Sequence, residues 1–150
     1  MPPMTNAPML CQQLALVTAA FFAGAAFYVS FAEQPARLLL DNRALLTQWR
    51  PSYQRGFIMQ ASLALASTLF GIAAFWMTRD WRWLIGTTLI FLNYPYTLLL
   101  ILPVNKRLEA TAPDRADANT RSQVERWGAL HGGRSALGVA ATIVDLWAMN

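Results

Sequence analysis

Four long apolar segments constrain the fold of this chain more than any other feature of its sequence. They cover residues 9–32, 57–78, 83–104 and 128–149. Each approaches or exceeds the about 20 residues that an α-helix needs to cross about 30 Å of hydrocarbon. Only helices and closed barrels satisfy their backbone in lipid, and the alternating ten-residue segments of a barrel do not occur here. We therefore predict an all-α fold, a single membrane domain over residues 1–150 with four transmembrane helices in one bundle.

The composition agrees with an integral membrane protein. Of the 150 residues 55% are hydrophobic and only 13% are charged, whereas soluble domains have about 25% charged residues. The net charge of +4 does not indicate a nucleic-acid partner, because the basic residues lie between the apolar segments and form no stripe with interleaved aromatic residues. The single cysteine, Cys11, excludes an intramolecular disulfide and is expected to be a packing residue.

The distribution of basic residues predicts the orientation in the bilayer. The segments after the first and third spans hold nine lysines and arginines, whereas the segment after the second span holds only Arg79 and Arg82. By the positive-inside rule, the two basic loops lie in the cytoplasm and both termini lie on the other side. We expect the inner membrane of a bacterial-type cell.

Two local patterns predict helix starts inside the basic loops. In "DNRALLTQWRP", Asp41 is a plausible N-cap and Pro51 a stop, which predicts a short interfacial helix in the first cytoplasmic loop. In "TRSQ", Thr120 and Gln123 match a capping box, which predicts that the fourth helix begins there, before the bilayer.

Polar residues fall at corresponding heights on the four predicted helices. Glu33 closes the first span, Gln60 lies one turn into the second, Asn105 closes the third and Asn93 lies about three turns deeper. Because the spans are antiparallel, this topology brings these side chains into the cytoplasmic half of one bundle. Polar groups in that position are costly, so such a cluster indicates a functional site.

The fourth span adds the only histidine of the chain to this cluster. Trp127, His131 and Arg134 follow an i, i+4, i+7 spacing and therefore share one helix face. Arg134 is expected either to snorkel toward the headgroups or to pair with Glu33 across the bundle. For His131 the alternative to a site residue is an interfacial histidine bonded to a backbone carbonyl.

A proline interrupts the third span. Pro95 cannot donate a backbone hydrogen bond and clashes with the carbonyl four residues earlier, that of Phe91, so we expect a kink there. Asn93 and the neighbouring Tyr94 and Tyr96 would then border a concavity suited to a flat aromatic ligand. The alternative is a kink that serves packing, with Asn93 bonded to a neighbouring helix.

The inventory of ligands argues against a resident metal. One histidine and one distant cysteine do not make a metal cage within one chain, so we expect no metal and no cofactor. Asp145, near the outer end of the fourth span, is expected to pair with Arg79 or Arg82 rather than to join a proton path.

Four motifs resemble the anthrone-oxygenase-like family of small four-helix membrane proteins. They are "SFAEQPARLLL", "QWRPSYQRG", "NYPYTLLLILPVNKRL" and "RWGALHGGRSALG", and the resemblance extends from about Gly24 to Leu146. Its most specific parts are Pro103–Asn105 and the Trp-x-x-x-His-x-x-Arg of Trp127–Arg134. The resemblance implies oxidation of anthrones to anthraquinones by O2 without metal or flavin. It also implies a functional set, which is His131, Arg134, Asn93 and Asn105.

The residues suit this chemistry. His131 is the natural base near neutral pH, Arg134 and the amides would stabilise an oxyanion, and Glu33 would orient His131 or balance Arg134. The expected substrate contacts are Asn93, Asn105, Trp127, Tyr96 and Gln60. Two alternatives stay open. One is a non-enzymatic membrane module, which binds a hydrophobic ligand or serves as an accessory subunit of a homo-oligomer or larger membrane complex. The other is a transporter.

Overall fold

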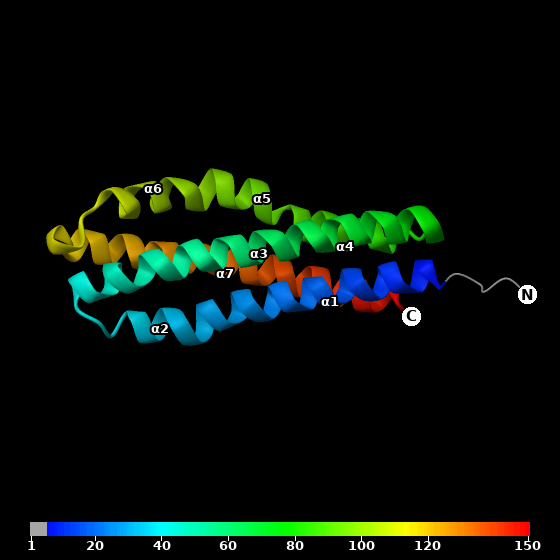
Figure 1. Ribbon diagram of the computed structural model, residues 1–150, viewed down its shortest axis with the longest axis horizontal. Helices are drawn as coiled ribbons and strands as arrows, with labels where there is room; N and C mark the ends of the chain where they lie inside the picture. The colour runs from blue at the N-terminus through cyan, green and yellow to red at the C-terminus, as the bar shows by residue number, and fades with distance from the viewer. Residues whose placement is uncertain (1–5) are drawn as a thin grey trace, which may run out of the picture.

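The computed structural model describes residues 6–150, and in this part of the chain nearly every residue is helical (Figure 1). In chain order the elements are α1 (Ala7–Tyr28), the π-helical segment η1 (Val29–Glu33), α2 (Gln34–Arg37), α3 (Asn42–Thr78), α4 (Arg82–Phe91), α5 (Asn93–Tyr96), the π-helical segment η2 (Thr97–Ile101), α6 (Leu102–Ala110), the 3₁₀ turn η3 (Pro113–Arg115) and α7 (Ala118–Ala148).

These elements build four antiparallel rods, which are α1 to α2, α3, α4 to α6, and α7. Both α1 and α4 pack against α3 and against α7, which makes a four-helix bundle with its C-terminus beside the start of α1 (Figure 1). Three rods, Ala7–Arg37, Asn42–Thr78 and Arg82–Ala110, are long and apolar enough to cross a membrane. Among the described residues α7 does not meet that standard, because polar residues such as His131, Arg134 and Asp145 interrupt its apolar sequence.

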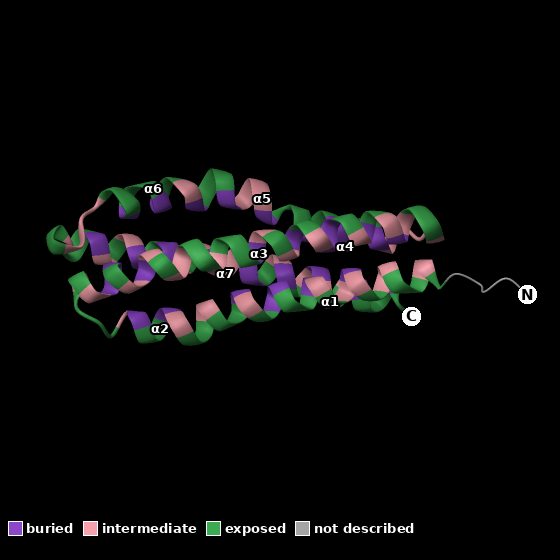
Figure 2. Cartoon of the chain, in the orientation of Figure 1, coloured by how far each residue is buried: buried purple, intermediate pink, exposed green. Residues whose placement is uncertain are grey.

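The hydrophobic core changes in character along the bundle. At the end that holds α6 it consists of large side chains, which are Leu45, Leu46, Trp49, Ile101, Val104, Leu108, Val124 and Trp127. Toward the other end the buried clusters are mostly alanine, with Phe22, Ile90 and Trp83 as the large members. Buried residues line the inward faces of all four rods (Figure 2). Small residues let helices approach closely. We therefore expect the helices to lie further apart at the end with the large side chains than at the alanine-rich end.

The start of α3 corrects one prediction. Asp41 caps the helix as expected, since its carboxylate accepts from the backbone N of Ala44 at 2.9 Å. The helix then runs through Pro51 to Thr78 without a break, so the separate interfacial helix and the stop at Pro51 were wrong. A proline inside a helix costs about 3 kcal/mol. Burial of Leu45 and Trp49 in the core, at about 1.5–3 kcal/mol for each large side chain, offsets that cost.

The start of α7 corrects another prediction, because Asp117 rather than Thr120 is the N-cap. The Asp117 carboxylate accepts from the backbone N of Thr120 at 2.8 Å, and the Thr120 hydroxyl accepts from the backbone N of Asp117 at 3.2 Å. These two bonds form a capping box one turn earlier than the sequence pattern suggested. The backbone N–H of Thr120 also holds the pKa of the Asp117 carboxyl below its usual value.

The third rod is interrupted where Pro95 predicts it. α4 ends at Phe91 and α5 begins at Asn93. In an unbroken helix the backbone N–H of residue 95 would donate to the Phe91 carbonyl, but proline has no N–H to donate. The π-helical segment η2 follows at once, and η1 interrupts the first rod near the same end of the bundle. Such segments change which side chains face inward and often occur at functional sites.

Candidate functional site

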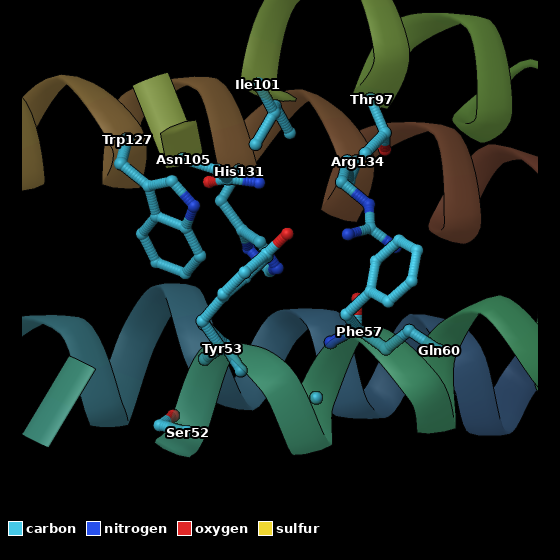
Figure 3. Close-up of a pocket in the computed structure, with 12 residues that line it drawn as sticks. Ser52, Tyr53, Phe57, Gln60, Thr97, Ile101, Asn105, Trp127, His131 and Arg134 are labelled. Atoms are coloured by element: carbon cyan, nitrogen blue, oxygen red, sulfur yellow. The ribbon is translucent and has the colours of Figure 1, made fainter. Parts of the chain in front are cut away.

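A small cavity lies inside the bundle between the facing surfaces of α3 and α7 (Figure 3). Its volume is about 20 Å³, which is room for one water molecule. The residues that line it are Val29, Ser52, Tyr53, Gly56, Phe57, Gln60, Thr97, Ile101, Asn105, Trp127, His131 and Arg134. Of the polar residues that the sequence predicts to converge, the structure therefore brings Gln60, Asn105, His131 and Arg134 to one cavity.

The His131 imidazole is buried and held on two sides. Its Nδ1 lies 3.2 Å from the Ser30 hydroxyl, which lies 2.9 Å from the Ser135 hydroxyl. The ring stacks on Trp127 with 5.0 Å between the ring centroids. Its other nitrogen, Nε2, has no hydrogen-bond partner within residues 6–150. The imidazole is thus oriented through its Nδ1 and through its stacking on Trp127.

Arg134 is a buried cation without a counterion. Its residue is only 7% exposed, its Nε has no partner, and no carboxylate pairs with it in the described part of the chain. The guanidinium lies over the Phe22 ring, 5.5 Å from the ring centroid. Arg134 therefore does not snorkel to the headgroups. Since an uncompensated buried charge costs several kcal/mol, this position favours a bound anion.

Three more polar side chains of the cavity have buried atoms without a hydrogen-bond partner among residues 6–150. Asn105 is fully buried, and neither atom of its amide is hydrogen-bonded. The same holds for Gln60 Oε1 and for the indole N–H of Trp127. Most buried polar groups in proteins are bonded, and each exception costs about 1–3 kcal/mol. The cavity thus offers donors and acceptors that a polar guest can satisfy.

Glu33 lies at the edge of this site but has other partners than expected. Its carboxylate accepts from Arg37 Nη2 at 2.6 Å, from Gln48 Nε2 at 3.0 Å and from the Ser52 hydroxyl. The expected pair with Arg134 is therefore wrong, and Glu33 makes no hydrogen bond to His131 among residues 6–150. Arg37 stands four residues later on the same rod, so it reaches the carboxylate without crossing the bundle.

Arg37 ties three rods together beside the cavity. Its side chain is buried, donates to Gln34 Oε1 at 2.7 Å and also donates to Gln48 and Ser52. Gln34 in turn donates to the backbone carbonyl of Val124 on α7 at 2.9 Å. The Arg37 guanidinium also lies over the Trp127 ring, 5.5 Å from the centroid. This network fixes the indole on which His131 stacks.

Asn93 belongs to a second cavity, of about 80 Å³, which also includes Tyr94. Phe57, Thr97 and Arg134 line both cavities, so they form the partition between them. Asn93 Nδ2 donates to the Ile90 carbonyl at 3.1 Å, while its Oδ1 is unpartnered. The two amides that the sequence predicts to cooperate thus line two different cavities, Asn105 the first and Asn93 the second.

Tyr96 lines neither of these two cavities, so its expected role as a substrate contact stays a prediction. Its hydroxyl donates to the Leu130 carbonyl at 2.9 Å. A Cβ at position 133 would lie 2.2 Å from the Tyr96 hydroxyl oxygen. The Tyr96 ring can therefore pack here because Gly133 has no side chain.

Asp145 also departs from its expected pairing. Arg82 pairs with Asp80 at 2.8 Å and so holds the pKa of that carboxyl below its usual value, while the Arg79 guanidinium lies over Trp76. Asp145 is buried against Gly86, where a Cβ would lie 1.9 Å from its Oδ1. The predicted pair with Arg79 or Arg82 was wrong, since each arginine has a nearer partner.

Gln60 was predicted, but Tyr53 and Phe57 on the same face of α3 were missed, although the sequence carried a signal for them. Tyr53, Phe57 and Gln60 on α3 repeat the i, i+4, i+7 spacing of the α7 residues and face them across the cavity (Figure 3). That repeat was a usable signal. Ser30 had none, because His131 and Ser135, which it contacts, lie on another rod. For Arg37 the i, i+4 spacing from Glu33 was a further signal. Within residues 6–150 no three histidine, cysteine or acidic side chains gather as metal ligands.

Comparison with known proteins gives one match. A family model described as anthrone oxygenase matches residues 49–144. This interval holds every residue that lines the cavity except Val29, and it leaves Glu33 outside. No curated protein and no solved structure matches the chain.

Proposed function

The chain belongs to the anthrone oxygenase family, and we propose that it is a membrane oxygenase that oxidises a flat, lipophilic phenolic substrate of the anthrone type with O2. The observation that carries this proposal is the buried Arg134 guanidinium, which has no counterion and shares a cavity with the His131 imidazole. A base beside an uncompensated cation suits a substrate that is bound as a neutral acid and reacts as its anion.

The proposed reaction balances with O2 as the only oxidant. His131 takes one proton from the methylene carbon of the anthrone, and Arg134 stabilises the charge that develops on the conjugated oxygen. The electron-rich anion reduces O2, and a carbon–oxygen bond forms to give a peroxide anion. The proton that His131 holds then passes to the outer peroxide oxygen, which gives a hydroperoxide. The second methylene proton then leaves while the O–O bond breaks, so that a ketone forms and water departs. Asn105 and Gln60 supply hydrogen bonds to the substrate oxygens.

Substrate entry requires movement of the partition. The cavity at His131 holds about 20 Å³ and the one at Asn93 about 80 Å³, whereas a tricyclic substrate is larger than both. Phe57 is 44% exposed at the bundle surface, so its ring can rotate outward without leaving an apolar environment. That rotation would join the two cavities and place Asn93, Arg134 and His131 around one guest.

The membrane placement is part of the proposal. Three rods are apolar enough to span a bilayer, and α7 packs along α1 and α4 and is proposed as the fourth span. The basic loops would lie in the cytoplasm and both termini outside, in a bacterial-type inner membrane. A bilayer concentrates both O2 and an apolar aromatic substrate.

The test is O2 consumption by the purified protein with 1,8-dihydroxyanthrone, for the wild type and for His131→Gln. We expect the variant to lose at least 100-fold in rate, which is the scale of a general base, while it keeps the thermal unfolding profile of the wild type. Equal rates above the uncatalysed oxidation would contradict the proposed role of His131. Binding of the anthrone without any catalysed O2 uptake would favour the ligand-binding module instead.

A further inference from the structure

A continuous surface groove runs along the other side of the third rod, away from the cavity. The part between α6 and the start of α7 has a volume of about 140 Å³. It is lined by Leu99, Leu100, Pro103, Val104, Arg107, Arg126 and Leu130. Its longer part, of about 350 Å³, is lined by Leu92, Pro95, Tyr96, Leu99, Leu100 and Leu137. Leu99 and Leu100 belong to both parts, so the groove is charged at one end and apolar along the rest.

The charged end of the groove carries two unpaired cations from different rods. Arg107 lies on α6 and Arg126 on α7, and both are exposed. The ion pairs found in the described residues are Glu33–Arg37 and Asp80–Arg82, so neither groove arginine has a carboxylate partner there. Basic pockets between membrane helices at the cytoplasmic side bind anionic lipid headgroups.

The length of the groove matches one leaflet. From Arg126 to Leu137 α7 rises about 16 Å at 1.5 Å per residue. Half of the about 30 Å hydrocarbon core is about 15 Å. Leu99 is 73% exposed and Leu100 is 47% exposed, so an acyl chain that starts at the arginines has apolar surface along its course.

We propose that this groove binds an anionic phospholipid, with its phosphodiester between Arg107 and Arg126 and one acyl chain along Leu99, Leu100 and Leu137. Charge complementarity selects an anionic headgroup over a zwitterionic one, whose own cation would lie near the two arginines. The apolar trough selects a lipid over free phosphate. The proposal is independent of the oxygenase function, because none of these residues lines the cavity at His131.

The experiment measures lipid retention by the full-length protein in detergent, with native mass spectrometry after addition of phosphatidylglycerol or phosphatidylcholine. We expect the wild type to retain phosphatidylglycerol at least tenfold better than phosphatidylcholine. Arg107→Gln/Arg126→Gln should abolish that preference. Arg43→Gln/Arg115→Gln, which removes two exposed arginines outside the groove, should retain it.

Two further arms separate the groove from its alternatives. Arg107→Lys/Arg126→Lys keeps the charge and should hold phosphatidylglycerol within about threefold of the wild type, even if the glutamine variant proves unstable. Inorganic phosphate at millimolar concentration should not displace the lipid. The proposal is overturned if the lysine variant loses the preference, if the Arg43/Arg115 variant loses it as well, or if free phosphate displaces the lipid.

Discussion

Arg134 is the residue whose placement most requires an explanation. Burial of a guanidinium without a carboxylate partner costs folding free energy. The chain forms such pairs elsewhere, because Glu33 pairs with Arg37 and Asp80 pairs with Arg82. Among the cations that are buried within residues 6–150, Arg37 has a carboxylate partner and Arg134 has none. We propose that an anionic reaction partner explains the position of Arg134 beside His131. Stability alone gives no reason to keep it there.

Substitution of Arg134 tests this explanation at the level of single residues. Arg134→Gln removes a charge-assisted hydrogen bond worth about 1.5–3 kcal/mol, so kcat/KM for an anthrone should fall about 10- to 100-fold. Arg134→Lys keeps the charge without the planar fork and should fall less. Steady-state O2 uptake measures both variants, and equal losses in the two would contradict a role for the charge.

Phe57 carries the second prediction at this scale. Phe57→Ala should join the two cavities, so that the substrate no longer has to displace the ring. Displacing the ring to an off-rotamer position would cost about 0.5–1.5 kcal/mol. We expect kcat/KM for a tricyclic substrate to rise about 2- to 10-fold. The matched control is Phe31→Ala, which removes an exposed ring from the first rod that lines neither cavity. A decrease for Phe57→Ala would mean that the ring contacts the substrate instead.

Residue identities were partly predictable from the sequence. The helical spacing of Trp127, His131 and Arg134 and the antiparallel topology sufficed to place these residues with Asn105 and Gln60. Contacts between rods were not predictable, because Gln48 and Ser52 reach Glu33 from α3 only once the rods have packed. Asn93 lines a neighbouring cavity instead of the one at His131, and no sequence pattern encodes that division.

At the scale of elements, the alanine-rich half of the bundle depends on close contact between α3 and α4. A Cβ at Gly71 would lie 2.1 Å from the Thr87 hydroxyl oxygen, which is buried and unpartnered. Gly24 on α1 is the opposite case, because no atom lies within 4 Å of a Cβ built there. The two glycines therefore provide a matched pair.

Gly71→Ala should reduce the free energy of unfolding by about 1–3 kcal/mol, the usual cost of overpacking. Thr87→Ala in the same chain should restore most of the loss, because it removes the obstructing atom. Gly24→Ala should be neutral or slightly stabilising, since alanine favours helix more than glycine does. Denaturant unfolding in detergent micelles measures the wild type, each of the three single variants and the Gly71→Ala/Thr87→Ala double variant. Additive effects of Gly71→Ala and Thr87→Ala would mean that the contact does not form.

The two prolines inside helical rods show what an element-level prediction can achieve. Pro95 ends α4 at the expected residue, whereas Pro51 sits inside α3 without a break. The local rule is the same for both, so the difference lies in the neighbours. Leu45 and Trp49 anchor the turns before Pro51 in the core, while the turn before Pro95 contains the exposed Phe91 and Leu92. Burial of this kind becomes visible only after the rods have packed.

At the scale of the whole molecule, the antiparallel bundle followed directly from four apolar segments, which are joined by one short connection and two long basic ones. The fourth segment shows the limit of that approach, because α7 carries its polar residues on an inward face and so falls below the hydropathy of the other three rods. Two of the residues that lower the hydropathy of α7, His131 and Arg134, also line the cavity.

Cysteine accessibility tests the proposed orientation. In a Cys11→Ser background, Asp114→Cys lies in the exposed basic loop and Asn150→Cys at the exposed C-terminus. An impermeant maleimide added to intact bacterial spheroplasts should label position 150, and position 114 only after lysis. The reverse pattern would place the basic loops outside. Equal labelling of both positions in sealed spheroplasts would contradict a C-terminal helix that crosses the bilayer.

The most direct test of the central claim is the absorption spectrum of 1,8-dihydroxyanthrone mixed with the detergent-solubilised protein under nitrogen at neutral pH. If the His131 and Arg134 cavity binds the substrate and stabilises its anion, the long-wavelength band of the anion will appear with a one-to-one titration endpoint. The band will be absent with Arg134→Gln, and admission of O2 will convert it to the anthraquinone spectrum. An unchanged spectrum with the wild type, or the same anion band with Arg134→Gln, would contradict the account.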